Sequence, residues 1–272
     1  MNCAARMVHV DEVWERIIEI WLEAFVDDTR GEVEDFLNMV CRGTDEYCFV
    51  WDEDGVPVSV TFALPAECVL AGGERISLRY IYAAATAHSH RGCGIFPRLL
   101  EYVHRYSAEQ GIDAMFLHPA GTGLEKYYEQ LGYRPCFCIE EQVMTRREFL
   151  AAILPSPTGA VVEWPEYITN YAAHSASREG GGMICTGGGH ALCVPQGDEL
   201  LIRDWRCAAD GGYELAAAVD GAFGAETLRI RMPAVAGQSV RNYGWVYPLD
   251  GNVGRLIDTN GDGLPYMGLV LD

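Results

Sequence analysis

A glycine-rich turn at residues 91–96 is the first place in this sequence where the residue types indicate chemistry. It reads Arg91-Gly92-Cys93-Gly94-Ile95-Phe96 and lies between an apolar stretch and an amphipathic one. Glycines let main-chain N–H groups crowd around an anion, and the start of a helix adds partial positive charge at the same place. The guanidinium of Arg91 could add a fixed fork of donors. The turn therefore predicts a site for a phosphate-bearing ligand.

The flanking segments have the periodicity needed to position this turn. Residues 77–86 end in small residues and predict a buried strand, and residues 95–106 carry an apolar stripe at helical spacing. Residues 114–118 predict a further strand that stops at a proline. Residues 124–133 predict a short helix with two tyrosines and a glycine stop. The predicted order is thus strand, turn, helix, strand and aromatic helix.

This order of parts resembles that of the GNAT superfamily of acyl-CoA-dependent N-acyltransferases. The Arg-Gly-Cys-Gly-Ile turn and the Tyr-Tyr-Glu-Gln-Leu-Gly-Tyr run at residues 127–133 are similar to that family's pyrophosphate and thioester motifs, and the resemblance covers roughly residues 7 to 145. Tyr-Ile-Tyr before the turn and Leu-His-Pro before the last helix are most similar to the multidomain "enhanced intracellular survival" acetyltransferases. Two positions depart from the family pattern. Phe96 stands where Gly or Ala usually closes the loop, and Gly121 stands where many relatives have Asn.

The resemblance implies an α/β (α+β) fold, with a mixed, mostly antiparallel sheet flanked by helices and a second, smaller GNAT-like half. We expect residues 1–150 to form the acyl-CoA-binding catalytic domain, residues 151–163 a linker, and residues 164–272 a degenerate GNAT-like domain. Two prolines and a glycine within residues 154–159 are typical of a linker.

The second half looks like a degenerate copy of the first. Residues 213–223 have helical spacing and residues 224–233 read as a strand ending in proline, as residues 111–119 do after the first helix. Where the copy should carry its phosphate loop, residues 208–212 contain no arginine, and Asp210 would repel pyrophosphate. We therefore expect one acyl-CoA site, in the N-terminal half.

The resemblance also implies which residues bind the acyl-CoA. In the family, the pantetheine arm lies along the splayed end of the central strand as if it were a further strand. The positions that match are Ala83, Ala84 and Ala85 for main-chain pairing with this arm, and Arg91, Gly92, Cys93, Gly94 and Ile95 for main-chain N–H groups at the pyrophosphate. Arg98, one helical turn beyond Gly94, would either meet the ribose phosphate or make a surface ion pair.

Tyr128 matches the general acid that protonates the departing thiolate in this family. A phenol with a pKa near 10 can do so at little cost, although the ring could instead pack beneath the cofactor. The general base is open between three candidates. His118 ends the strand beside the thioester and titrates in a useful range. Asp272 is the second, because residues 266–272 read as a strand and the related multidomain enzymes bring their terminal carboxylate into the active site. A chain of water molecules is the third.

The composition limits the classes of partner. Of the 272 residues, 39 are acidic and 20 basic, an excess of 39 − 20 = 19 negative charges. Such a surface repels nucleic acid and attracts amines. The sequence has no apolar run long enough for a bilayer and no secretory signal, so we expect no membrane partner and a cytoplasmic location. The ten cysteines include no CxxC pair, and the spacing of Cys136 and Cys138 is poor for zinc, so we expect no metal site.

The combined expectation is an acyl-CoA-dependent N-acetyltransferase that transfers an acetyl group from acetyl-CoA to a primary amine of a small, cationic acceptor. A homo-oligomer stays open. Two alternatives remain: a tandem-GNAT acyltransferase that forms a small-thiol or amino-acid conjugate, and a non-catalytic acyl-CoA-binding sensor. Phe96 and Gly121 keep the sensor open, whereas retention of Tyr128 and of the Arg91 loop argues against it.

Overall fold

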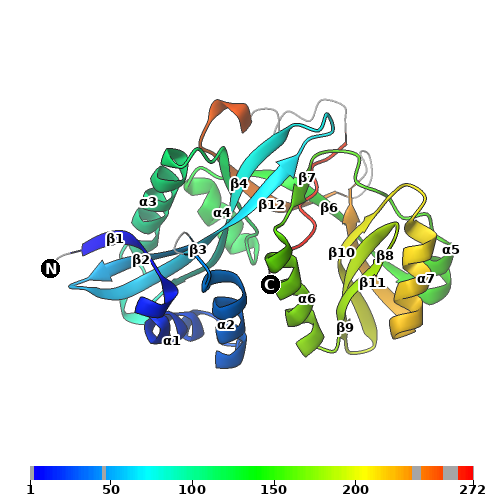
Figure 1. The fold of residues 1–272 in the computed structure, drawn as a ribbon, viewed down its shortest axis with the longest axis horizontal. Helices are drawn as coiled ribbons and strands as arrows, with labels where there is room; N and C mark the ends of the chain where they lie inside the picture. Colours follow the sequence, from blue (N-terminus) through cyan, green and yellow to red (C-terminus); the bar gives the residue numbers. More distant parts are fainter. Residues whose placement is uncertain (1–2, 45–46, 235–239, 254–262, 272) are drawn as a thin grey trace.

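The computed structural model describes residues 3–44, 47–234, 240–253 and 263–271. Within these residues the strands join one sheet flanked by helices (Figure 1). The strand order is β1-β2-β3-β4-β5-β12-β6-β11-β10-β9-β8, with β7 paired to β3. Most neighbouring strands are antiparallel, whereas the pairs β4–β5 and β10–β11 are parallel. The predicted fold class is confirmed.

The first half of the chain supplies six strands and five α-helices among the described residues. The strands are β1 (Cys3–Val8), β2 (Cys48–Glu53), β3 (Val56–Val69), β4 (Arg75–Thr86), β5 (Ala114–Leu117) and β6 (Arg134–Thr145). The helices are α1 (Trp14–Ala24), α2 (Arg30–Phe36), α3 (Ile95–Glu109), α4 (Thr122–Gln130) and α5 (Arg146–Ala151). Short helical turns lie at Val10–Glu12, Leu37–Cys41 and His88–His90. The predicted order of strand, turn, helix, strand and aromatic helix is present as β4, the turn at residues 91–94, α3, β5 and α4.

The second half repeats this pattern in a reduced form. Its elements are β7 (Val161–Glu163), α6 (Glu166–Arg178), β8 (Gly182–Thr186), β9 (Gly189–Gln196), β10 (Glu199–Cys207), α7 (Gly212–Phe223), β11 (Thr227–Pro233), β12 (Arg241–Pro248) and the helical turn Gly251–Val253. The run β9-β10-α7-β11 has the same connections and strand directions as β3-β4-α3-β5. The internal repeat inferred from the sequence therefore corresponds to a repeated unit of the fold.

The two halves exchange strands at the centre of the sheet. β12, from the second half, lies between β5 and β6, where Val246 is paired with Phe116 and with Arg134. β6, from the first half, continues into the second half by pairing with β11. Each parallel pair is thus extended by an antiparallel strand that the other half supplies. The boundary expected at residues 151–163 stays a prediction, and this segment includes β7, which pairs with β3 of the first half.

Three groups of buried side chains hold the helices to the sheet. The largest lies beneath α1, α2 and α6 and includes Trp21, Phe36, Phe62 and Tyr171. A second lies beneath α3 and α4, and a third lies beneath α5 and α7 in the second half. Helix α6 packs on the same apolar group as α1 and α2. The second half therefore contributes to the hydrophobic core of the first half.

The strand expected over residues 266–272 is wrong for the part that the structure describes. Tyr266 makes a single parallel bridge to Val161, and the chain after it is not extended into a strand. Gly268 has φ +64°, a left-handed conformation that breaks an extended ladder. Asp272 lies outside the described residues.

Two searches of the described residues gave no candidates. In residues 3–44, 47–234, 240–253 and 263–271, no helix is long and apolar enough to cross a membrane. The same residues contain no group of three or more His, Cys, Asp or Glu side chains placed to hold a metal ion.

A buried histidine of α3, His104, predicts acid sensitivity of the fold. The Nε2 atom of His104 is 2.8 Å from the Tyr133 hydroxyl, and its ring stacks on Tyr247 with centroids 4.1 Å apart. Burial lowers the pKa of His104 to about 4. The unfolded chain binds this proton near pH 6.5. The stabilisation is therefore complete above pH 6.5 and is lost as the pH falls towards 4.

We expect the wild-type protein to lose about 2 kcal/mol more unfolding free energy than His104→Gln between pH 7 and pH 5. Glutamine keeps a partner for the Tyr133 hydroxyl but does not titrate. Urea unfolding of both proteins at the two pH values measures the difference. Equal losses in the two proteins would contradict the assignment.

Candidate active site

The central strand β4 separates from its parallel neighbour at the point where the site begins. β4 and β5 pair only from Leu78 to Tyr80, opposite residues 114–116, although β4 continues to Thr86. The pairing of β4 with β3 shifts register across Tyr82 to Ala85, and Ala83 has φ +47°. A non-glycine residue rarely adopts this conformation, and a bulge re-aims the main chain next to it. Within the part of the chain that the structure describes, the main-chain edge of residues 83–84 on the β5 side therefore has no paired strand.

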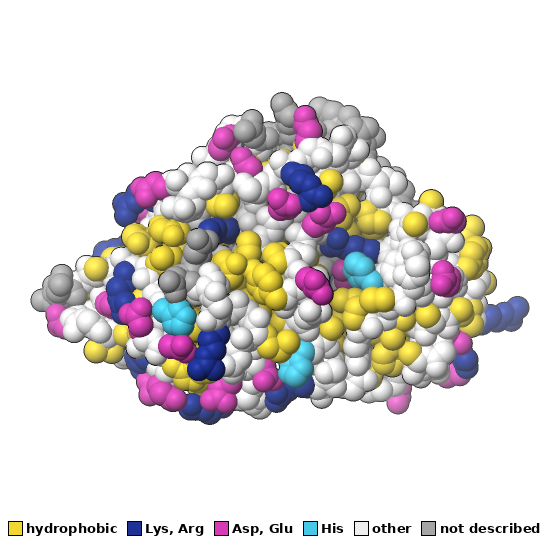
Figure 2. All heavy atoms as spheres, in the orientation of Figure 1, with side chains coloured by type: hydrophobic (Ala, Val, Ile, Leu, Met, Phe, Trp, Pro, Cys, Tyr) yellow, Lys and Arg dark blue, Asp and Glu magenta, His cyan; other side chains and the backbone are white. Residues whose placement is uncertain are grey.

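A cavity of about 510 Å³ lies at this divergence. It is lined by Ala83 and Ala84 of β4, by His118 after β5, and by Tyr128 of α4. Four of the residues predicted from the sequence are thus brought together. Val270 and Leu271 also line the cavity, which lies near the chain end marked in Figure 1. In the middle of the face drawn in Figure 2, hydrophobic side chains gather over the same region.

The glycine turn forms the N-terminal end of α3. Gly92 and Gly94 have φ of +75° and +70°, and a Cβ at either position would meet nothing within 4 Å. α3 begins without a side-chain cap, and Pro97 in its first turn has no N–H to donate. Among the described residues, no hydrogen bond uses the main-chain N–H groups of residues 92–96. These five donors and the helix terminus form a cradle that suits an anion.

Arg91 braces this turn. Its Nε atom donates to the Thr86 carbonyl at 2.9 Å, and one terminal nitrogen donates to the Glu23 carbonyl at 2.7 Å. Two donors of the expected fork are therefore used to tie the turn to β4 and α1. Its match to the phosphate loop through the main chain stays a prediction.

The remaining predicted cofactor residues lie around the cradle. Cys93 is exposed, Ile95 is buried beneath α3, and Phe96 packs against the apolar group under α3 and α4. Arg98 is exposed on the first turn of α3, and among the described residues it forms no ion pair. Ala85 is buried outside the cavity lining, and its carbonyl accepts a hydrogen bond from Ser59 Oγ at 2.8 Å.

Tyr128 faces the cavity from α4 and is only 8% exposed. Burial, reinforced by the neighbouring Tyr127, raises the pKa of its phenol well above the ordinary value. The hydroxyl therefore stays protonated at neutral pH, as a proton donor must be before it acts.

His118 is held by a main-chain hydrogen bond. Its Nδ1 atom is 2.5 Å from the Tyr243 carbonyl oxygen, and its ring lies 4.4 Å from the Tyr243 ring. A carbonyl can only accept, so Nδ1 carries a proton in this contact, and a neutral ring would have its lone pair on Nε2. This tautomer can take a proton from a ligand in the cavity. For the alternative base, Asp272, only the neighbouring Val270 and Leu271 are described.

The sequence analysis missed several residues of the cavity wall. Trp21 and Phe25, at the end of α1, face the cavity together with Tyr82, and Trp21 Nε1 donates to Asp28 Oδ2 at 2.6 Å. Glu125 lies one turn before Tyr128 on α4 and is half-buried in the lining. From β12 come Arg241, Asn242 and Trp245. The alternation of aromatic residues at 243, 245 and 247 was the available signal for this strand.

The equivalent turn of the second half is closed. Residues 208–211 join β10 to α7, as residues 87–94 join β4 to α3. Here the Ala208 N–H donates to the Gly188 carbonyl at 2.7 Å, and a Cβ at Gly211 would lie 2.5 Å from the same oxygen. The turn between β8 and β9 therefore occupies the space that a phosphate would need.

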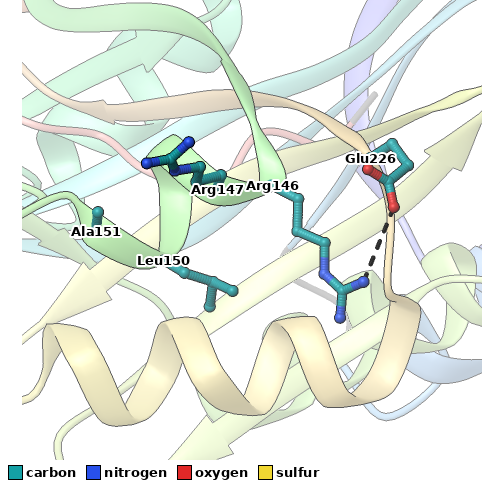
Figure 3. A pocket seen from close by; sticks show the side chains of 5 residues that line it. All are labelled: Arg146, Arg147, Leu150, Ala151 and Glu226. Atoms are coloured by element: carbon teal, nitrogen blue, oxygen red, sulfur yellow. Dashed lines mark ion pairs between the residues drawn. The ribbon is translucent and has the colours of Figure 1, made fainter.

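A second depression of about 480 Å³, between α5 and the turn before β11, has a different character (Figure 3). Arg146 leans from α5 towards Glu226 at 3.8 Å and also forms two hydrogen bonds with Asp220, at 2.5 and 2.9 Å. None of the residues that line it is a predicted site residue. The positive charge of Arg146 is already paired with the carboxylates of Asp220 and Glu226.

Comparison with known proteins agrees with this geometry. Residues 7–136 match the model of a family described as acetyltransferase (GNAT) domain. No curated protein matches the sequence. Among solved structures, Eis1 from Mycobacterium abscessus is similar with a TM-score of 0.69 and 14% identity, over 92% of this chain and 74% of that one.

Two further structures give the same result. A GCN5-related N-acetyltransferase from Kribbella flavida has a TM-score of 0.70 and 14% identity, over 92% of this chain and 71% of its own. A probable N-acyltransferase from Enterococcus faecalis has a TM-score of 0.71 and 12% identity, over 92% of this chain and 73% of its own. At these identities the likeness concerns the fold. Residues 7–136 thus match the acetyltransferase (GNAT) domain family, and the overall fold of the chain is similar to that of Eis1.

Proposed function

We propose that this protein transfers an acetyl group from acetyl-CoA to the primary amine of a small, cationic acceptor. The observation that carries the proposal is the cradle of unbonded main-chain N–H groups at residues 92–96, next to a cavity that contains Tyr128. A scaffold protein has no need for an anion cradle beside a buried phenol.

The described residues fit an acyl-CoA. The cradle and the exposed Arg98 would hold phosphates, because both supply donors in a chain that is otherwise strongly acidic. The unpaired edge of residues 83–84 would pair with the amide groups of the pantetheine arm. An acyl-CoA supplies an acetyl group activated as a thioester, so the protein need only orient it and manage protons.

Two side chains could manage the protons of this reaction. His118, when its ring is neutral, would take a proton from the acceptor ammonium, directly or through water. Tyr128 would give its proton to the departing sulfur. The burial that raises the phenol pKa also raises the basicity of a thiolate in the same cavity, so the two remain matched.

One part of the cavity lining, formed by Trp21, Phe25, Asp28, Tyr82 and Glu125, favours an acceptor that has both a positive charge and an apolar group. Trp21, Phe25 and Tyr82 present aromatic rings, which bind apolar surface and attract cations. Asp28, oriented by the indole of Trp21, and Glu125 add two carboxylates to the cavity lining. An ammonium group would find both a charge partner and an aromatic face there.

The test is turnover of acetyl-CoA against a panel of amines, followed by release of free thiol. We expect Asp28→Asn to raise the KM for a dicationic amine by about fivefold, as for loss of one exposed charge pair, with unchanged affinity for acetyl-CoA. Asp27→Asn is the matched control, since Asp27 is also exposed but does not line the cavity. Saturable acetyl-CoA binding without turnover of any amine would instead favour the sensor.

A further inference from the structure

A buried carboxylate in the second half is the charged group least explained by acetyl transfer. Asp204 of β10 is 2% exposed. Its Oδ1 atom accepts a hydrogen bond from the Tyr266 hydroxyl at 2.7 Å, and its Oδ2 atom lies 3.3 Å from His190 Nε2 and 3.4 Å from Arg206 Nε. Burial alone would raise the pKa of Asp204, but Arg206, His190 and Tyr266 together lower it below its ordinary value. The group is therefore a buried, ionised and fully engaged carboxylate.

Three residues of this cluster's surroundings, Asp204, Trp205 and Arg206, contact the segment 266–271. The Tyr266 hydroxyl also accepts the Trp205 main-chain N–H at 3.2 Å, and Arg206 donates to the Met267 carbonyl at 3.2 Å. Gly268 passes so close that a Cβ there would lie 2.5 Å from an Arg206 nitrogen and 2.6 Å from Asp204 Oδ1. The cluster thus contacts three consecutive residues of this segment.

Main-chain pairing of this segment is limited to its first residue among those that the structure describes. The Tyr266 N–H donates to the Ala160 carbonyl at 2.8 Å, and the Val162 N–H donates to the Tyr266 carbonyl at 3.0 Å. Among the described residues this single bridge is its only β pairing. Three residues later, Val270 and Leu271 line the cavity that contains Tyr128. The position of this wall therefore depends on what holds residues 266–268, together with the burial of Leu269, Val270 and Leu271 in the largest apolar group.

If the role of this cluster were purely structural, apolar side chains would fill the same space at a lower cost in free energy. Burying an ion pair costs desolvation energy that well-packed apolar groups avoid, whereas a paired carboxylate fixes one geometry. Here the fixed geometry is an irregular main chain leading to the cavity.

We propose that Asp204, with Tyr266 and Arg206, positions residues 266–271 as a wall of the acceptor side of the cavity, and so controls amine binding without touching the amine. These are positioning residues. The effect on amine binding rests on the proposed acetyl transfer. The effect on the position of residues 266–271 can be measured without turnover.

The test compares Asp204→Asn and Tyr266→Phe with wild type in two measurements. Hydrogen exchange should rise by about tenfold in residues 264–271 and stay unchanged in β4 and α3. The KM for the amine should rise by about fivefold, while calorimetry gives an unchanged Kd for acetyl-CoA. Tyr266→Phe removes only one hydroxyl, so it keeps the test available if Asp204→Asn does not fold.

Asp220→Asn is the matched control. It breaks the Arg146 pair in the same half, but Asp220 contacts no residue of the segment 266–271 that the structure describes. It should leave both measurements unchanged. Unchanged exchange in residues 264–271 of Asp204→Asn and Tyr266→Phe would overturn the proposal, as would a parallel loss of acetyl-CoA affinity. If wild type turns over no amine, the function fails and the exchange result alone decides the positioning.

Discussion

Replacing Tyr128 with phenylalanine is expected to lower kcat for acetyl transfer by about 100- to 1,000-fold, the usual contribution of a positioned general acid. The substitution removes one hydroxyl from the cavity wall and keeps the ring that packs near Tyr127 and Tyr133. The departing thiolate would then have to take its proton from water. Affinity for acetyl-CoA should not change, because the phenol acts only as the bond to sulfur breaks.

Tyr127→Phe supplies the matched control for this prediction. Tyr127 is the next residue on α4, is half-buried and does not line the cavity. Its loss of a hydroxyl should leave kcat within about twofold of wild type. Stopped-flow detection of free thiol, with calorimetry for acetyl-CoA, separates the two effects. An undiminished kcat in Tyr128→Phe would remove Tyr128 from the mechanism.

The second large effect is expected at the anion cradle, where Gly94→Asp should weaken acetyl-CoA binding by about 100-fold, or about 2.7 kcal/mol. A Cβ at Gly94 meets no atom within 4 Å, so the side chain fits the folded protein. Its carboxylate would stand beside the N–H groups of residues 92–96 and repel a diphosphate. Aspartate also tolerates the left-handed main chain better than most residues do.

The variant Gly111→Asp tests whether main-chain strain alone lowers the affinity for acetyl-CoA. Gly111 lies just after the other end of α3, has φ +76°, and also has open space beyond its Cα atom. The two variants therefore carry the same change at similar main-chain angles, at opposite ends of one helix. We expect Gly111→Asp to bind acetyl-CoA as wild type does. Equal affinities in both variants, measured by calorimetry, would contradict the placement of the phosphates.

The parts of the site that could be predicted from the sequence are those formed by residues close together in the sequence. The glycine turn, the stripe of α3 and the tyrosine helix each occupy fewer than about twenty residues, and their spacing follows from helix and strand periods. The cavity position of Ala83, Ala84, His118 and Tyr128 followed once β4, β5 and α4 were ordered. Arg91 was interpreted less well, because its carbonyl partners at residues 23 and 86 depend on how α1 packs.

The missed parts depend on contacts between distant residues. Trp21 reads as one more member of an apolar helix stripe, and nothing local shows that this stripe ends at a cavity. β12 meets β5 and β6 across more than a hundred residues of chain, so its pairing has no local signal. The strand expected over residues 266–272 was wrong because Gly268 turns away to pass Asp204 and Arg206, both distant in sequence.

Because β6 and β12 are exchanged between the halves at the centre of the sheet, we expect the molecule to unfold as one cooperative unit. If residues 1–150 were released alone, β5 would lose β12, and β6 would lose both β12 and β11, so open strand edges would be left at the centre of the sheet. A destabilising change at the far end of the second half is therefore transmitted to the first through shared hydrogen bonds.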